Sequence, residues 1–388
     1  MELTDNVAFI KHGDPVGEFL QLRGDKSLNL DTNYMEQILE VVGDRKIMVI
    51  GTNYVKENKY YKDDKIVLFS FAKQKKILDY LHLFYDRKIY ALLEKFKPHL
   101  IFHLGSIWNM SAAIRYSKNN SIPLVIAFAG QLRKKNIFAQ TLQNLLIGNM
   151  LIHLKSLQMI LVRNADNKRI LNTIGIPKEK ITIYYPKYSS NFFQKREIED
   201  FLNDSRKTRI LYVGRLEISK GTNLIIEAII NIFSKFHDIE IIFIGDGTQY
   251  KRLCDMSNNI NDKYREQHNV MRVLGSRPFE TLYSYYTNVD ITVLPSYGEG
   301  MPKTVIESLL SGTPVIASDL PGIREIVKDG ETGYIFEAGN IKQFTQCIER
   351  CISNPEILSL FRTNIEKDKD RIRNLGQDYK EVIKQFLN

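Results

Sequence analysis

Residues 294–312, LPSYGEGMPKTVIESLLSG, decide the fold class of the C-terminal half of this sequence. They begin as the end of an apolar strand and pass through the turn Gly298-Glu299-Gly300. They then enter a predicted helix with Pro302 at its first position, where the missing N–H has no intrahelical partner. A helix start offers backbone N–H groups and a partial positive charge to a phosphate or a sugar hydroxyl. Glu299 and Glu307 frame this start, so the stretch predicts a strand–turn–helix site with a carboxylate at each end of the ligand.

Further motifs lie on both sides of this stretch. In chain order they are Tyr212-Val213-Gly214-Arg215-Leu216, Lys220-Gly221, Ile244-Gly245-Asp246-Gly247, Leu274-Gly275, Ser311-Gly312-Thr313-Pro314-Val315-Ile316-Ala317-Ser318 and Gly330-Glu331-Thr332-Gly333-Tyr334. Together with the spacing Glu299–x7–Glu307, this order resembles the donor site of the retaining glycosyltransferases of family 4. The resemblance covers most of the C-terminal half. It implies an α/β protein of the GT-B fold, in which two Rossmann-like domains with parallel sheets face a central cleft.

The resemblance also implies roles for individual residues. Glu299 corresponds to the residue that contacts hydroxyls of the transferred sugar, and Glu307 to the residue that holds the ribose hydroxyls of the donor. The other donor-binding residues that it implies in this half are Gly300, Met301, Pro302 and Lys303, through their backbone, and Ser276 and Arg277 at the nucleobase.

Arg215 and Lys220 flank a turn between a strand and a helix. Negative charge grows on the leaving diphosphate as a glycosidic bond breaks, so fixed cations aimed at it stabilise the transition state more than the ground state. Arginine offers a planar fork to phosphate oxygens and lysine a point charge. We therefore expect catalysis to depend on Glu299, Arg215 and Lys220, without a metal or a cofactor, since no acidic doublet stands in the expected loop. The alternative interpretation is a pair of surface cations at a loop.

The N-terminal half alternates β-rich runs with helical patterns, which predicts a parallel sheet with crossover helices. Ligands of such sheets lie beyond the carboxyl ends of the strands. That rule points to Gly13 and Gly17 beside the donor, and to His12 and His103 on the acceptor side. Turn glycines and hydrogen-bonded structural histidines are the alternatives. Ala129 stands where many family members have a histidine, so the activation of the acceptor hydroxyl is not defined by the sequence.

At 388 residues the chain is long for one hydrophobic core, which predicts two domains. We expect an acceptor-binding domain over 1–190, a sugar-nucleotide-binding domain over 191–366, and a helix over 367–388 that crosses back to the first domain. The strands expected are 7–11, 46–51, 66–71, 100–103, 123–128, 159–162, 210–214, 240–244, 270–274, 291–295, 313–317 and 333–336. The helices expected are 73–96, 109–119, 137–155, 164–174, 196–203, 340–352, 356–364 and 367–387.

Positive charge is concentrated in the N-terminal half. Residues 1–190 contain 28 Lys and Arg and 17 Asp and Glu, whereas the rest of the chain contains 26 and 28. A basic half favours an anionic acceptor or an anionic membrane surface as a partner. The alternative is a Lys-rich composition with a solvated face. No recognition helix or stacking platform for nucleic acid is evident, so nucleic acid is not expected as a partner.

The sequence favours a cytoplasmic protein that can associate peripherally with the inner face of the membrane. Its three cysteines show neither metal-ligand spacing nor a disulfide framework. No signal peptide is evident, and the long apolar window 142–162 is interrupted by polar residues, so no membrane span is expected.

The function expected from these features is hexosyl transfer with retention of configuration. The donor would be a nucleotide-diphosphate sugar, and a UDP-sugar is favoured over the others. The acceptor would be a glycan or a lipid-linked molecule of surface polysaccharide biosynthesis. Two alternatives use the same architecture: a sugar-nucleotide epimerase, and a non-catalytic subunit that binds a sugar nucleotide. Neither the sugar, the base, the linkage nor the oligomeric state follows from the sequence.

Overall fold

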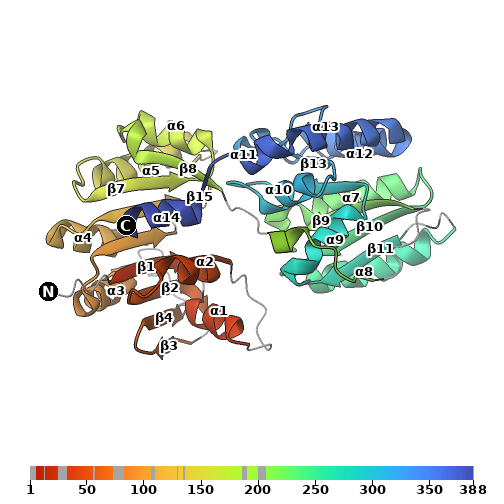
Figure 1. The fold of residues 1–388 in the computed structure, drawn as a ribbon. Helices are drawn as coiled ribbons and strands as arrows, with labels where there is room; N and C mark the ends of the chain where they lie inside the picture. Colours follow the sequence, from red (N-terminus) through yellow and green to blue (C-terminus); the bar gives the residue numbers. More distant parts are fainter. Residues whose placement is uncertain are drawn as a thin grey trace. The chain divides into compact units, whose positions relative to one another are not determined.

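The computed structural model describes residues 6–12, 14–24, 33–55, 57–72, 83–105, 110–128, 130–133, 136–185, 190–199, 207–266, 268 and 270–387. Contacts divide the chain into two compact units (Figure 1). Unit 1 comprises Met1–Tyr185 and Gly376–Asn388, and unit 2 comprises Pro186–Leu375. The C-terminal segment that belongs to unit 1 begins at Gly376. The sequence predicted that the segment crossing back to the first domain begins at Lys367.

Unit 1 contains a sheet with the strand order β15-β8-β7-β6-β5-β1-β2-β4-β3. Neighbouring strands are parallel, except that β3 runs antiparallel to β4. The central strands are apolar runs buried on both faces, as parallel strands between helical layers require. The strands are β1 (Val7–His12), β2 (Ile47–Val55), β3 (Lys59–Lys62), β4 (Ile66–Ala72), β5 (Leu100–Leu104), β6 (Leu124–Phe128), β7 (Leu157–Val162), β8 (Ile181–Tyr185) and β15 (Gln377–Asp378).

Helices cover both faces of this sheet, and each face has its own hydrophobic core. One core joins the sheet to α3 (Leu83–Phe96), α4 (Ser111–Asn120), α5 (Ile137–Leu151) and α6 (Ala165–Thr173). The other joins it to α1 (Pro15–Leu22), α2 (Asn33–Val42) and α14 (Tyr379–Leu387).

Unit 2 contains a parallel sheet with the strand order β11-β10-β9-β12-β13-β14. The strands are β9 (Thr208–Val213), β10 (Ile239–Ile244), β11 (Val270–Gly275), β12 (Ile291–Leu294), β13 (Val315–Ser318) and β14 (Gly333–Phe336). The helices are α7 (Thr222–Phe233), α8 (Tyr250–Lys263), α9 (Leu282–Thr287), α10 (Lys303–Leu310), α11 (Pro321–Arg324), α12 (Ile341–Ser353) and α13 (Pro355–Arg373). The strand order reverses at β9 and β12, and such a switch point is where open α/β sheets bind ligands.

The predicted α/β class with two parallel-rich sheets is confirmed, and the predicted strands lie close to observed ones. Four predicted helices differ, and residues 73–82 and 200–203 of two predicted helices lie outside the described residues. Residues 196–199 are not helical, because the backbone N–H and C=O of Arg196 bond to the Ser284 hydroxyl at 2.6 and 2.9 Å. The helix expected over 137–155 ends at Leu151, and the one expected over 356–364 continues to Arg373. The helix expected over 367–387 is interrupted between Arg373 and Tyr379. No bounds were predicted for β3, β8, β15, α1, α2, α7, α8, α9 or α11.

Candidate active site

Two loops of unit 2 meet at the carboxyl ends of β9 and β12. The backbone N–H of Tyr297, after β12, donates to the carbonyl of Ser219, after β9, at 3.0 Å. Gly221 has a φ of +79°, and a Cβ there would lie 2.0 Å from the carbonyl oxygen of Pro295. Only glycine allows this backbone conformation and this close approach together. The predicted switch-point site is therefore a pair of tightly packed loops.

Lys220 and Glu299 form an ion pair at this junction. The Lys220 Nζ lies 2.6 Å from the Glu299 Oε1, although the two residues are 79 positions apart in the chain. Their side chains are 18% and 12% exposed, so solvent still reaches both. An ammonium group carries three N–H donors, of which Glu299 accepts one. The structure thus brings together two of the three predicted catalytic residues.

Arg215, the third of these residues, lies in the loop directly after β9 and is exposed. Its carbonyl accepts a hydrogen bond of 2.6 Å from the hydroxyl of Tyr212, which is fully buried in β9. Burial raises the pKa of Tyr212, and the nearby carboxylate of Glu299 raises it further, so the hydroxyl keeps its proton and remains a donor. Tyr212 is a positioning residue that the sequence analysis quoted only as part of a motif.

Glu307 lies inside α10 and is 4% exposed. Its Oε2 accepts a hydrogen bond of 2.9 Å from the hydroxyl of Tyr286, a fully buried residue of α9. A buried carboxylate needs such donors, because burial without them would disfavour its charged form. The sequence analysis missed Tyr286, since a tyrosine in an apolar helix usually signals only core packing.

The start of α10 differs from the prediction by one residue. Pro302 is the N-cap, with ψ at 116°, and the helix begins at Lys303. The prediction that Pro302 is the first helical residue is wrong, because this ψ is extended. For the same reason Met301 lies outside the first helical turn, where the sequence had placed it. Met301 and Pro302 are buried and Lys303 is half-buried, while the hydroxyl of Thr304 donates to the carbonyl of Val213 at 3.0 Å. That bond fixes the helix start against the end of β9. The backbone contacts expected at Gly300 stay predictions.

Arg277 and Ser276 follow β11, at the edge of the same sheet. The Arg277 guanidinium pairs with Glu199 at 2.6 Å, donates to the Tyr285 hydroxyl at 3.1 Å and donates to the carbonyls of Leu274 and Ser276. Burial raises the pKa of Glu199, but hydrogen bonds from Tyr285 and Arg277 outweigh it and hold this pKa below its usual range. Burial and the bond to Glu199 raise the pKa of Tyr285 to about 12. The guanidinium thus shapes this loop, and base recognition there stays a prediction.

In unit 1, Gly17 does not lie in the loop after β1. It lies within α1, where its N–H donates at 3.0 Å to Asp14, the N-cap residue. The expected place of Gly17 in the loop after the first strand is therefore wrong, and its contact with the donor stays a prediction. Lys11, at the end of β1, forms a buried ion pair of 2.5 Å with Glu18 of α1, which the sequence analysis did not predict.

The other predicted residues of unit 1 are less informative. His103 lies in β5 and is 1% exposed, which favours the structural role over contact with an acceptor. His12 is the last residue of β1. The His12 side chain, Gly13 and Ala129 lie outside the described residues.

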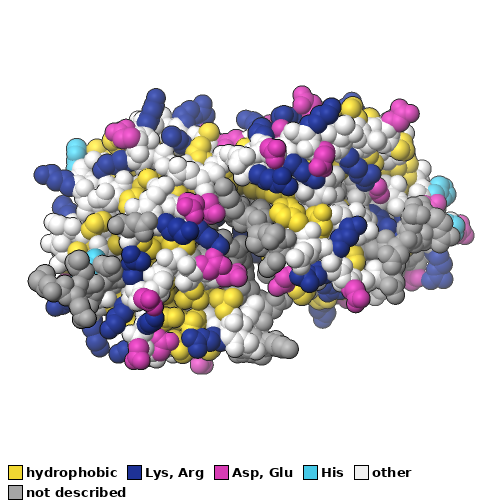
Figure 2. All heavy atoms as spheres, viewed as in Figure 1, with side chains coloured by type: hydrophobic (Ala, Val, Ile, Leu, Met, Phe, Trp, Pro, Cys, Tyr) yellow, Lys and Arg dark blue, Asp and Glu magenta, His cyan; other side chains and the backbone are white. Residues whose placement is uncertain are grey.

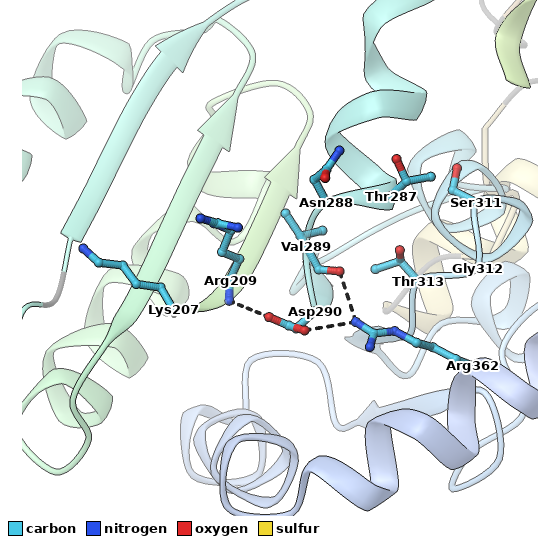
Figure 3. A pocket seen from close by; sticks show the side chains of 10 residues that line it. All are labelled: Lys207, Arg209, Thr287, Asn288, Val289, Asp290, Ser311, Gly312, Thr313 and Arg362. Carbon is cyan, nitrogen blue, oxygen red and sulfur yellow. Dashed lines mark hydrogen bonds and ion pairs between the residues drawn. The ribbon is translucent and has the colours of Figure 1, made fainter. Parts of the chain in front are cut away.

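A cavity of about 560 Å³ lies at the opposite end of the unit 2 sheet (Figure 3). Asp290 lies between the backbone N–H of Arg209 and the guanidinium of Arg362, at 2.9 and 3.0 Å. Arg209 lies at the start of β9 and Asp290 directly precedes β12, so the cavity lies at the amino ends of these strands. It is therefore separate from the candidate active site at their carboxyl ends. Within the described ranges, no group of three His, Cys, Asp or Glu side chains could hold a metal ion. No described helix is long and apolar enough to span a membrane.

The chain is similar to known proteins in sequence and in fold. The chain is similar to the capsular polysaccharide biosynthesis glycosyltransferase CapM of Staphylococcus aureus, with 28% identity over 228 residues, 55% of this chain and 57% of CapM. Sucrose-phosphate synthase from Thermosynechococcus elongatus superposes with a TM-score of 0.71 at 18% identity, covering 98% of this chain and 97% of that one. Anabaena HepE in complex with UDP gives a TM-score of 0.67 at 16% identity, covering 99% and 98%.

The chain spans about half the length of the first curated relatives that it matches, between 43% and 55%. The structural likeness covers nearly the whole chain and shows the fold. The family model Glycosyl transferases group 1 matches residues 193–368, which include both loops of the candidate active site. Residues 193–368 are therefore a glycosyl transferases group 1 domain, in a chain of the GT-B fold.

Proposed function

We propose that this chain is a retaining glycosyltransferase of family 4, a hexosyltransferase that uses a UDP-sugar. The observation that carries the proposal is the pairing of Lys220 with Glu299 beside Arg215, at the switch point of unit 2. In the reaction, the acceptor oxygen bonds to the anomeric carbon and the bond from that carbon to the diphosphate breaks. UDP leaves with the electron pair, and the proton of the acceptor hydroxyl passes to the departing diphosphate or to water.

The side chains at the switch point match the charge changes of this reaction. Arg215 and Lys220 would stabilise the growing negative charge of the diphosphate, and Glu299 would hold the sugar hydroxyls while it orients Lys220. An epimerase would need an acid and a base at the sugar carbon in place of an acceptor groove, and it would lack the combination of Arg215, Lys220 and the spacing Glu299–x7–Glu307. Because CapM belongs to capsular polysaccharide biosynthesis, we infer a glycan or lipid-linked acceptor in surface polysaccharide synthesis. We also place the chain in the cytoplasm, where its cysteines, all free thiols, remain reduced.

The function itself can be tested with a panel of sugar nucleotides. UDP-sugars should raise the melting temperature of the protein, because a ligand that binds only the folded state stabilises it. An enzyme should also release UDP slowly from one of them in the absence of acceptor. A thermal shift without UDP release, even with acceptor glycans present, would instead support the non-catalytic binding subunit.

Glu307→Ala should weaken UDP binding by about 10- to 100-fold. The substitution removes a carboxylate that we expect to accept hydrogen bonds from the ribose, and bonds to charged groups contribute about 1.5–3 kcal/mol each. Tyr286→Phe should weaken binding less, because it removes only the donor that positions this carboxylate. Isothermal titration with UDP measures both effects.

Tyr283→Phe, on the same helix α9, is the matched control and should leave UDP affinity unchanged, since Tyr283 makes aromatic contacts with Phe192 and Phe193. Wild-type affinity in Glu307→Ala would show that Glu307 does not bind the ribose.

Sugar transfer should continue in EDTA. The proposal assigns the neutralisation of the diphosphate to Arg215 and Lys220, so no metal is required. UDP should be quantified directly by chromatography, because coupled enzyme assays themselves depend on magnesium. Loss of turnover in EDTA that magnesium or manganese restores would contradict the metal-independent mechanism.

A further inference from the structure

Helix α5 in unit 1 is apolar on two opposite sides. Its sequence, IFAQTLQNLLIGNML, contains no charged residue. One side, with Ile147 and Leu151, is buried in the core of unit 1. Large apolar side chains also extend along the opposite side, where Phe138 is 76% and Leu145 58% exposed. A surface helix normally has one apolar side, which faces the core, so a second apolar side on the same helix calls for a partner.

The exposed side chains form one continuous strip. Phe138, Leu142, Leu145 and Leu146 are spaced by four, three and one residues, which places them on one side of a helix. We call these four residues the α5 strip. Ile137, which is 85% exposed, and Ile152 extend it at its two ends. Contiguous apolar surface of this kind marks a site of interaction with a protein or a membrane.

The stretch of the chain that contains α5 is positively charged. Residues 95–165 contain nine Lys and Arg and no Asp or Glu, and Arg133 and Lys155 lie on either side of the helix in the chain. The next acidic residue, Asp166, pairs with Arg133 at 2.5 Å and with Arg169 at 2.8 Å, so it offsets part of the charge at Arg133 while Lys155 stays on the other side of the helix. Figure 2 shows hydrophobic side chains among both basic and acidic side chains on one face of unit 1.

This charge pattern discriminates between partners. A symmetric contact between two copies would bring the same basic flanks together, and like charges oppose such an interface. An anionic lipid surface suits both the apolar strip and the positive charge. Apolar side chains insert at the boundary of headgroups and acyl chains, and basic residues are attracted to the anionic headgroups. We propose that the α5 strip docks unit 1 on an anionic membrane surface. This docking does not require the glycosyl transfer proposed above, and its test does not measure transfer.

The full chain should sediment with vesicles of phosphatidylcholine and phosphatidylglycerol, and much less with vesicles of phosphatidylcholine alone. Binding should fall as salt rises, since attraction between surface charges is screened beyond about 8 Å at physiological ionic strength. The triple variant Phe138→Ser, Leu142→Ser, Leu145→Ser should bind anionic vesicles at least roughly a hundredfold more weakly, because it removes three large inserting side chains. Lys155→Gln should weaken binding by a few-fold.

Two control variants lie in unit 2. Leu360→Ser removes a comparably exposed leucine, 55% exposed, and Arg265→Gln removes an exposed charge. Both should bind like the wild type, and circular dichroism should show that the triple variant is folded. Unchanged vesicle binding by the folded triple variant would overturn the proposal. Equal binding of the wild type to neutral and anionic vesicles would also overturn it, as would a dimer in sedimentation velocity that the triple variant abolishes.

Discussion

Replacing Arg215 or Lys220 by alanine should lower kcat/KM for sugar transfer by roughly 10²-fold or more. Each cation is expected to make one or two charge-assisted bonds to the diphosphate, at about 1.5–3 kcal/mol per bond, and about 1.4 kcal/mol corresponds to a factor of ten. Because the charge on the diphosphate grows towards the transition state, kcat should fall as well as donor affinity. Steady-state kinetics with varied UDP-sugar separates the two effects.

Lys220→Ala should be the more damaging of the two substitutions. It removes a cation and leaves the Glu299 carboxylate without its partner at 2.6 Å, so a negative charge remains where the diphosphate must bind. The double variant should lose less than the two single losses combined, since both cations act on one anion.

Lys235→Ala removes an ion-paired surface lysine of the same unit, 2.7 Å from Glu349, and should leave kcat/KM unchanged. If both active-site variants keep the wild-type kcat and raise only KM, then Arg215 and Lys220 bind the donor without stabilising the transition state.

Gly245→Ala should cost unit 2 at least about 3 kcal/mol of unfolding free energy, or prevent it from folding. Gly245 has a φ of +141°, and a Cβ there would lie 1.9 Å from the carbonyl oxygen of Gly214. That oxygen belongs to the backbone directly before Arg215, so it cannot move aside as a flexible side chain would. Relief of the clash would have to displace the loop that carries Arg215.

Gly330→Ala is the matched control for this substitution. Gly330 also has a positive φ, +74°, but a Cβ there would have no atom within 4 Å. Alanine at Gly330 should therefore cost only the backbone strain, about 1–2 kcal/mol. Denaturant unfolding of each variant gives the comparison. Equal losses at the two positions would show that the close approach of Gly245 to Gly214 is not what requires glycine there.

Much of unit 2 could be predicted because its strands are short apolar runs that end in glycine-containing turns. The positions of Arg215, Lys220 and Glu299 near one another followed from the family resemblance and from the charge that a leaving diphosphate requires. Their direct contact did not, because a sequence gives no distance between residues 79 positions apart. Tyr286 was missed for a related reason, since its hydroxyl becomes informative only when Glu307 is seen beside it.

Local sequence also failed where distant contacts decide the backbone. Residues 196–199 are mostly charged, as in an exposed helix, yet Ser284 holds Arg196 in an irregular conformation. Pro302 has a φ compatible with a helix start, but its ψ is extended and the helix begins one residue later.

The path of the chain through unit 1 has a consequence for its biosynthesis. β15 pairs with β8 at the edge of the unit 1 sheet, and Tyr379 of α14 is buried against Tyr184, with 5.6 Å between the ring centroids. On the ribosome, residues 376–387 emerge only after all of unit 2 has been translated. Unit 2 is contiguous and can complete its sheet first, whereas the nascent unit 1 must wait with an open sheet edge and a partly uncovered core. A cell that makes this chain must therefore protect unit 1 for longer than unit 2, although translation of unit 1 begins earlier.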